Sequence, residues 1–247
     1  MKKFLLFLTF FSFEVLSTIV DDRPEDIIPI RLLIPDIKMD IRYFSKRNFV
    51  GEEIIGYISE NCYLQEEAAK ALKKVQEDLK KINLELLLFD CYRPQMAVNH
   101  FARWAENPTD SKMKAIFYPN VPKDELFNRG YIAHRSGHSK GNTVDLGIIT
   151  KTADLKKIKQ LNLRDCRTPI SSEEKNLGLL EMGTHYDCFD EKSHTMNKTI
   201  PLEATENRKV LVNIMEKNGF KNYSKEWWHF SYYKNQYPDT FHNFPVE

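Results

Sequence analysis

The sequence has no excess of charge and little glycine. Its 36 Lys and Arg residues face 35 Asp and Glu residues, which leaves a net charge of +1 without a basic stripe. Nothing in this balance favours a nucleic-acid partner. Only 9 glycines are present, and no glycine-rich phosphate-binding loop, fixed-period repeat or low-complexity segment is found. With 247 residues and 42% hydrophobic content, the chain is predicted to form one domain with its own core.

Long hydrophobic runs are missing as well. The apolar run at residues 4–13 is too short to span a bilayer, but it has the length of a signal-peptide hydrophobic region and follows two lysines. Glu14 comes directly after the run and no Ala-x-Ala cleavage site follows, so a buried N-terminal segment or a membrane tether is the alternative. We expect an export signal over residues 1–20, cleaved within 17–21. The mature protein would then be periplasmic or secreted, with no stable membrane span, and cytoplasmic if the leader does not function.

Cysteine is also scarce, with Cys62, Cys91, Cys166 and Cys188 only. No pair has zinc-ribbon spacing, so ligation of a metal by cysteine is not expected. Four cysteines allow three fully paired connectivities, and the sequence does not rank them. Export would permit disulfides, whereas free buried thiols are equally compatible with the sequence.

The hydrophobic pattern predicts helices and strands in irregular alternation. Ala69, Leu72, Val75 and Leu79 recur at helical spacing, whereas the segment LELLLFD and the segment TVDLGII are typical of buried strands. Without a regular βαβ repeat, the chain is expected to be α+β with a largely antiparallel sheet. We predict helices over 65–82, from Pro94 to about 107, over 123–131 and over 206–218, strands over 84–90, 143–149 and 227–233, an extended start over 26–43, and a charged, partly helical insertion over 150–180.

The stretch SGHSKGNTVDL, residues 136–146, places His138 and Asp145 on either side of a Gly-Asn pair. Residues seven apart on a straight strand point to opposite faces, so the two side chains could not share an ion there. Gly141 and Asn142 both tolerate the positive φ of a tight turn, which would let the side chains converge. The alternative is an ordinary polar turn.

The stretch EWWHF contains a second pair, Glu226 and His229. A spacing of three places two residues on one face of a helix, but the aromatic neighbours favour a strand, where odd spacing separates the faces. A bulge or bend would reconcile the two. Taken alone, the segment is more often a core histidine beside two structural tryptophans.

Together these stretches supply two imidazoles and one carboxylate. Three such ligands, His138, Asp145 and His229, leave one tetrahedral position open, as in catalytic zinc sites. A carboxylate beside the ligands can accept a proton from water, and Glu226 is placed for this. Arg93 in DCYRP is a candidate for stabilising an oxyanion, although an arginine beside a proline is otherwise a routine solvated helix start.

Five segments in this order resemble the zinc D-alanyl-D-alanine dipeptidases of the VanX type. They are DCYRPQMAVNHF, SGHSKGNTVDL, MGTHYDCFDEKSH, YSKEWWHF and the terminal FPVE, and the resemblance covers residues 40–247. Several matches in a row are more specific than any single motif. The resemblance implies a compact single α+β domain over residues 21–247, with a central antiparallel sheet flanked by helices.

The resemblance also implies an activity and its residues. The activity is zinc-dependent hydrolysis of the free dipeptide D-Ala-D-Ala to two D-Ala by a metal-activated water. The implied roles are one Zn²⁺ per chain on His138, Asp145 and His229, Glu226 as general base, Arg93 as stabiliser of the intermediate with Asp90 orienting it, Ser136 and Asp187 at the substrate's amino end, and Tyr43 lining the substrate.

Two features depart from the family. Its short cytoplasmic members lack the leader and most of residues 150–180, and an insertion there would reshape the mouth of the pocket. Export would favour wall-fragment recycling or dipeptide scavenging over depletion of a cytoplasmic pool. The alternative functions are a zinc D,D-carboxypeptidase acting on peptidoglycan stem peptides and a non-catalytic zinc-stabilised binding domain. The sequence does not give an oligomeric state.

Overall fold

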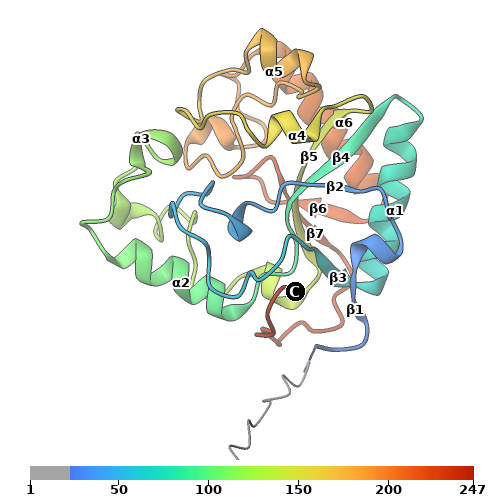
Figure 1. Ribbon diagram of the computed structural model, residues 1–247, viewed down its shortest axis with the longest axis horizontal. Helices are drawn as coiled ribbons and strands as arrows, with labels where there is room; N and C mark the ends of the chain where they lie inside the picture. Colours follow the sequence, from blue (N-terminus) through green and yellow to red (C-terminus); the bar gives the residue numbers. More distant parts are fainter. Residues whose placement is uncertain (1–22) are drawn as a thin grey trace, which may run out of the picture.

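A five-stranded sheet forms the centre of the chain, which the computed structural model describes over residues 23–247 (Figure 1). The strand order is β2-β4-β5-β7-β6. β2 runs parallel to β4 and the other neighbouring pairs are antiparallel, which confirms the predicted α+β fold with a mainly antiparallel sheet. The strands are β2 (Lys38–Met39), β4 (Leu84–Asp90), β5 (Thr143–Thr150), β6 (Phe220–Asn222) and β7 (His229–Tyr232).

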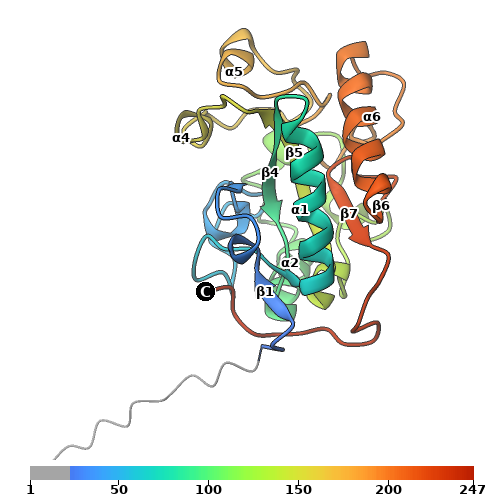
Figure 2. The same ribbon diagram turned by 90° about the vertical axis from the view of Figure 1, so that its right-hand side faces the viewer.

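Two long helices, α1 (Glu66–Lys80) and α6 (Leu202–Lys217), pack side by side against one face of this sheet (Figure 2). The predicted periodicity of α1 is confirmed, because Leu72, Val75 and Leu79 are buried. Gln76 adds a polar link, since its side-chain oxygen accepts the Leu86 N–H at 2.8 Å. One helix face therefore buries apolar side chains and also satisfies a backbone donor of the sheet.

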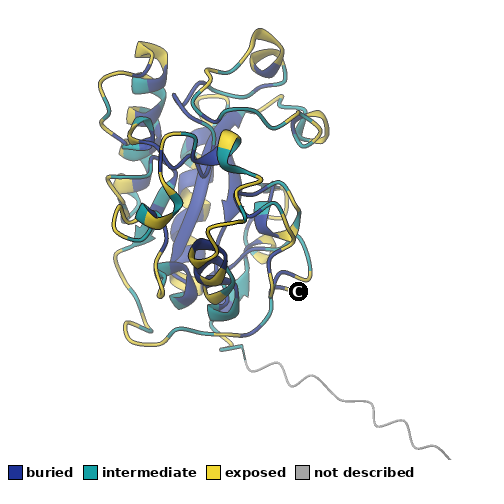
Figure 3. Cartoon of the chain, turned by 90° about the vertical axis from the view of Figure 1, so that its left-hand side faces the viewer, coloured by how far each residue is buried: buried dark blue, intermediate teal, exposed yellow. Residues whose placement is uncertain are grey.

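The opposite face of the sheet carries α2 (Gln95–Glu106), which begins directly after Pro94 as predicted (Figure 1). Val98 and Phe101 on α2 line a cavity between this helix and the strands. A second, two-stranded sheet of β1 (Ile27–Pro29) and β3 (Tyr63–Gln65) closes one end of the domain. In Figure 3 the strands form the buried centre of the molecule, and the exposed residues gather on the helices and loops.

Residues 150–180 extend from the end of β5 and contain two short helices, α4 (Leu155–Ile158) and α5 (Ser172–Asn176). The segment returns to the sheet through a bridge between Ile149 and Leu179. Ser171 and Glu174 form a capping box at the start of α5, a motif that satisfies two backbone donors at once. The partly helical character predicted for this region is confirmed.

Other elements differ from the prediction at their ends. The helix expected over 123–131 is reduced to one 3-10 turn, η3 (Lys123–Glu125). Helix α6 starts at Leu202, four residues before the predicted 206, because Pro201 occupies its N-cap and the helix can begin there. The strand predicted over 227–233 is only β7, because Trp227 and Trp228 form a turn before it.

All four cysteines are paired, as Cys62–Cys91 and Cys166–Cys188. This is one of the three pairings that the sequence left open, and the free-thiol alternative is wrong. Within the described residues, no helix has the length and apolar character needed to cross a membrane. The leader expected over residues 1–20 lies outside the described residues.

Candidate metal centre and active site

The register of the sheet brings three polar side chains together on its three inner strands. Asp90 on β4 pairs with Asp145 on β5, and Asp145 pairs with His229 on β7. Residues opposite each other on neighbouring antiparallel strands have Cβ atoms about 5 Å apart. Asp145 and His229 are 84 residues apart in the sequence, and strand pairing alone makes their side chains neighbours.

His138 reaches the same place from a 3-10 turn, η4 (Gly137–Lys140), that precedes β5. Gly141 ends the turn with φ +79°, a conformation that glycine adopts without steric cost. Since His138 lies on this turn and not on the strand, the opposite-face problem does not arise. Asn142 does not share the positive φ, and its side chain instead donates to the Tyr232 carbonyl at 3.0 Å.

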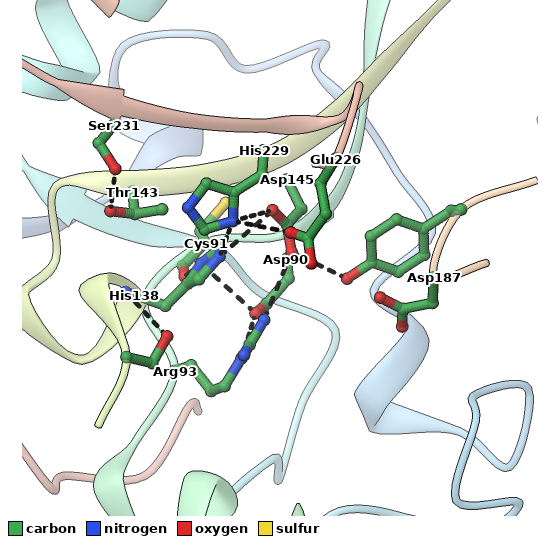
Figure 4. A network of polar contacts seen from close by, with 12 residues as sticks. Asp90, Cys91, Arg93, His138, Thr143, Asp145, Asp187, Glu226, His229 and Ser231 are labelled. Carbon is green, nitrogen blue, oxygen red and sulfur yellow. Dashed lines mark hydrogen bonds and ion pairs between the residues drawn. The ribbon is translucent and has the colours of Figure 1, made fainter. Parts of the chain in front are cut away.

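Three ligand atoms, His138 Nε2, His229 Nδ1 and Asp145 Oδ1, form a nearly equilateral triangle. Their separations are 3.3 Å between the two nitrogens and 3.2 and 3.1 Å from these nitrogens to the carboxylate oxygen. Zinc bonds of about 2.0–2.1 Å in a tetrahedron place neighbouring ligands about 3.3–3.4 Å apart. Asp145 Oδ1 is also buried without a hydrogen bond of acceptable geometry to any described residue. The residues present therefore fit a divalent metal (Figure 4).

A backbone carbonyl fixes the orientation of His138. The Cys91 oxygen lies 2.7 Å from Nδ1, and because a carbonyl only accepts, Nδ1 must carry the proton and Nε2 a lone pair. Burial lowers the pKa of His138, which favours the neutral ring that a metal requires. Burial opposes ionisation of Asp145, but the two imidazoles outweigh it and hold the pKa of this carboxyl well below its ordinary value.

Glu226 stands beside this triangle. The turn at Trp227 and Trp228 closes with the His229 N–H donating to the Glu226 carbonyl at 3.3 Å. In a straight strand the two side chains would point to opposite faces, but this bend places Glu226 Oε2 3.4 Å from His229 Nδ1. Both tryptophans are buried and hold the turn in place. Burial raises the pKa of Glu226 to about 7, so the carboxylate can gain or release a proton near neutral pH.

Arg93 lies across the centre from Glu226 (Figure 4). Its Nε donates to Asp90 Oδ2 at 2.8 Å and its Nη2 to Asp145 Oδ2 at 3.3 Å. The guanidinium also lies over the Tyr43 ring, 5.0 Å from the centroid. Two carboxylates and an aromatic face fix the planar group in one orientation.

Asp187 is connected to the centre through two tyrosines. The Tyr43 hydroxyl donates to Asp187 Oδ2 at 2.9 Å. The Tyr186 hydroxyl lies 3.1 Å from both the Tyr43 hydroxyl and Asp145 Oδ2, and can donate to one of them at a time. Asp187 has φ +59°, which is uncommon for a residue with a side chain. Burial, helped by the charge of Asp145, raises its pKa well above the ordinary value.

One cavity of about 250 Å³ joins these groups. The structure brings eight sequence-predicted site residues to its wall, namely Tyr43, Arg93, Ser136, His138, Asp145, Asp187, Glu226 and His229. Asp90, expected to orient Arg93, contacts it at 2.8 Å without lining the cavity. Ser136 also caps the η4 turn, accepting the His138 N–H at 3.3 Å. Arg135 lines the cavity as well and is exposed, with its guanidinium over the Phe241 ring and no ion pair to a described residue.

Sequence reasoning missed three groups that support the centre. They are the hydroxyl of Tyr186, the carbonyl of Cys91, and Tyr57, which donates to Asp90 Oδ1 at 2.6 Å. Tyr186 directly precedes Asp187 in the segment MGTHYDCFDEKSH, so its position beside a predicted site residue could have indicated it. A backbone carbonyl leaves no side-chain signal, and Tyr57 lies outside every motif.

Comparisons with known proteins find one family model and several relatives that match most of the chain. The model of the peptidase family M15, described as D-Ala-D-Ala dipeptidase, matches residues 23–158 and 166–247. The chain is 35% identical over 214 residues to a D-alanyl-D-alanine dipeptidase of Streptomyces coelicolor, covering 87% of this chain and 95% of that one. It is 34% identical to one of Enterococcus faecalis over the same shares. A D-alanyl-D-alanine dipeptidase of Escherichia coli is 27% identical over 205 residues, with 83% of each chain covered.

Proposed function

The chain belongs to the M15 peptidase family of D-Ala-D-Ala dipeptidases, and from this premise we propose that it hydrolyses free D-Ala-D-Ala to two D-Ala with one zinc ion per chain. The observation that carries the proposal is the triangle of His138, Asp145 and His229 with Glu226 beside it. A purely structural ion needs no adjacent base. The arrangement therefore favours catalysis over a zinc-stabilised binding domain.

Each side chain at the centre has a chemical task in this proposal. A zinc ion supplies a Lewis acid that polarises water and the peptide carbonyl. Glu226 takes the proton of the attacking water and passes it to the leaving amine, for which a pKa of about 7 suits both steps. Arg93, held by Asp90, places its remaining donors where negative charge develops on the carbonyl oxygen.

Two charged residues of the cavity wall, Asp187 and Arg135, are complementary in charge to the two ends of a free dipeptide. Asp187 is buried and pushed towards its neutral form, so an ammonium beside it would restore the carboxylate and form a desolvated ion pair. An N-blocked peptide brings no such charge and leaves the acid buried against an amide. Arg135, whose guanidinium has no ion-pair partner among residues 23–247, could bind the substrate carboxylate. These features favour a dipeptidase over a D,D-carboxypeptidase acting on stem peptides.

We propose further that residues 1–20 are an export signal and that residues 21–247 act outside the cytoplasm. Two disulfides support this location, since such bonds persist in oxidising compartments. Dipeptide scavenging or recycling of wall fragments would then be the role. No residue of the segment 150–180 lines the cavity, so the expected reshaping of the pocket mouth is not seen, and the segment is joined to the Asp187 loop through Cys166–Cys188.

The test combines metal content with turnover. Purified protein should release D-Ala from D-Ala-D-Ala, lose this activity to a chelator and regain it with added zinc. Glu226→Gln should keep one zinc per chain, measured by mass spectrometry of the metal, and lose kcat by about 10²-fold or more. Full activity in metal-free protein, or an active Gln variant, would contradict the mechanism. Comparable cleavage of the free and N-acetylated dipeptides would instead favour the carboxypeptidase.

A further inference from the structure

Both disulfides are attached directly to the segments that carry the site. Cys91 lies between Asp90 and Arg93, and Cys188 directly follows Asp187. All four sulfur-bearing residues are at most 1% exposed. The two bridges span similar lengths of chain, 29 and 22 residues. Each therefore has a different neighbour in the site but a similar effect on the entropy of the unfolded chain.

The Cys62–Cys91 bridge joins the two supports of the His138 turn. On one side, the Cys91 carbonyl accepts the His138 Nδ1 proton at 2.7 Å, and the Arg93 N–H donates to the His138 carbonyl at 3.3 Å. On the other side, Gln65 of β3 donates from its backbone to the Gly141 carbonyl and from its side chain to the Lys140 carbonyl, both at 2.7 Å.

Cys62 begins the segment that leads into β3, so the disulfide closes these supports into one covalent frame. The adjacent residues are also joined directly, because the Tyr92 N–H donates to the Tyr63 carbonyl at 3.0 Å. The carbonyl that sets the tautomer and orientation of His138 therefore belongs to a cross-linked residue, Cys91, and the next residue along the chain is hydrogen-bonded to β3.

The Cys166–Cys188 bridge acts on the other end of the cavity. The Cys188 carbonyl accepts the Ser193 hydroxyl at 2.6 Å and the Asp190 N–H at 2.9 Å. The Cys166 carbonyl accepts the His185 N–H at 2.8 Å. Asp187 lies inside this frame with φ +59°, a conformation that persists only when its surroundings impose it.

We propose that the two disulfides are positioning elements with separate duties: Cys62–Cys91 holds His138 in the orientation for a metal, and Cys166–Cys188 holds Asp187 in the orientation for a substrate ammonium. The second duty rests on the proposed function, whereas the first concerns metal binding alone. Loss of the first bridge lets the Cys91 carbonyl drift from Nδ1. Loss of the second lets Asp187 leave the left-handed conformation and its hydrogen bond to Tyr43.

The two double variants C62A/C91A and C166A/C188A are matched controls for each other. Zinc affinity, measured by competition with a chromophoric chelator, should weaken by about 10- to 100-fold in C62A/C91A and stay within about twofold in C166A/C188A. The KM for D-Ala-D-Ala should rise by about tenfold or more in C166A/C188A, with kcat changed less. Long-range ¹⁵N NMR of the metal-free proteins should show a mixture of His138 tautomers in C62A/C91A only.

A general loss of stability would lower the melting temperature of both variants and leave zinc affinity equal between them, and that result would overturn the proposal. Should C62A/C91A fail to fold, reduction of C166A/C188A with a phosphine opens only the Cys62–Cys91 bridge and keeps both of its sulfur atoms in the chain, so its zinc affinity tests the same duty. An unchanged affinity in fully reduced, folded protein is a refutation.

The failure of the proposed function gives a different pattern. If wild-type protein binds zinc but does not cleave D-Ala-D-Ala, that substrate is wrong and the zinc comparison still decides the first duty. A crystal structure of C166A/C188A then decides the second duty. Asp187 with a negative φ and without the Tyr43 hydrogen bond supports it, and an unchanged Asp187 overturns it.

Discussion

Replacing Asp187 by Asn isolates the charge that we assign to recognition of the amino group. The change keeps the size of the side chain, and Asn is one of the few residues that tolerate the φ of +59° found here. The Tyr43 hydroxyl, 2.9 Å from Oδ2, can donate to the amide oxygen as it does to the carboxylate. Because burial already raises the pKa of Asp187, removing the charge should not lower the melting temperature.

The cost should appear only when a substrate brings an ammonium. Breaking a buried ion pair by removing one partner costs about 3–5 kcal/mol. The lower figure corresponds to a fall of about 150-fold in kcat/KM for D-Ala-D-Ala. The N-acetylated dipeptide carries no ammonium, so the variant and the wild type should cleave it equally slowly. The kcat/KM values for the free and the N-acetylated dipeptide should therefore differ less in the variant than in the wild type.

The assay measures the release of D-Ala by chromatography, over a range of concentrations of each dipeptide, to give kcat/KM for both. Asp190→Asn is the matched control, because Asp190 is also buried but caps η5 outside the cavity, and Asn is an equally good cap. A variant at position 187 that cleaves the free dipeptide within about threefold of the wild type would refute the reasoning. An equal loss in the Asp190 variant would refute it too.

Three further changes test other parts of the structure. Tyr186→Phe removes the hydroxyl 3.1 Å from Asp145 Oδ2 and should weaken zinc binding by about tenfold in chelator competition. An unchanged affinity would show that Arg93 alone is enough to orient the Asp145 carboxylate. Burial lowers the pKa of His185 to about 4, below about 6.5 in the unfolded chain, so the unfolded chain binds more protons and stability falls as pH drops through this window. Between pH 7.5 and 5 urea unfolding should show a loss of about 2 kcal/mol that His185→Asn removes, and equal pH dependence in the two proteins would exclude this cause. Gly141→Ala should lower stability by about 1–2 kcal/mol, because alanine disfavours φ +79° and its Cβ would lie 3.1 Å from Ile27 Cδ1; a neutral result in urea would contradict the strain.

The local pattern of the sequence predicts the elements that bury most apolar surface. Helix α1 follows from its helical periodicity, whereas strands β4 and β5 follow from short, largely apolar segments that are buried almost throughout. The predicted site residues also meet in one cavity. That convergence depends on strand register, which places Asp90, Asp145 and His229 in a row and which no local pattern contains.

The features that the sequence does not predict depend on contacts between segments that are far apart in the chain. The bend at Trp227 and Trp228 reads as a continuous aromatic strand, because the pattern of residues is the same whether or not the chain turns. The helix expected near Lys123 is one turn whose three residues are not buried, so it has no apolar face to extend it. The disulfide partners follow from tertiary contacts alone, and four cysteines at these spacings carry no order of preference.

The balance of charge at the centre links the metal, the substrate and the choice between free and blocked peptides. The carboxylates of Asp90, Asp145, Asp187 and Glu226 surround the guanidinium of Arg93, and these five groups, when all ionised, carry three excess negative charges. The other guanidinium of the cavity wall, that of Arg135, is exposed. The raised pKa values of Asp187 and Glu226 follow from burial first and then from this excess. In the proposed complex a divalent cation and the substrate ammonium would supply three positive charges that balance the cluster, and Arg135 would balance the substrate carboxylate. Acetylation of the substrate would remove the charge of the ammonium. We therefore expect the cluster to select a free amino end by charge, independently of its contacts with the D-alanyl side chains.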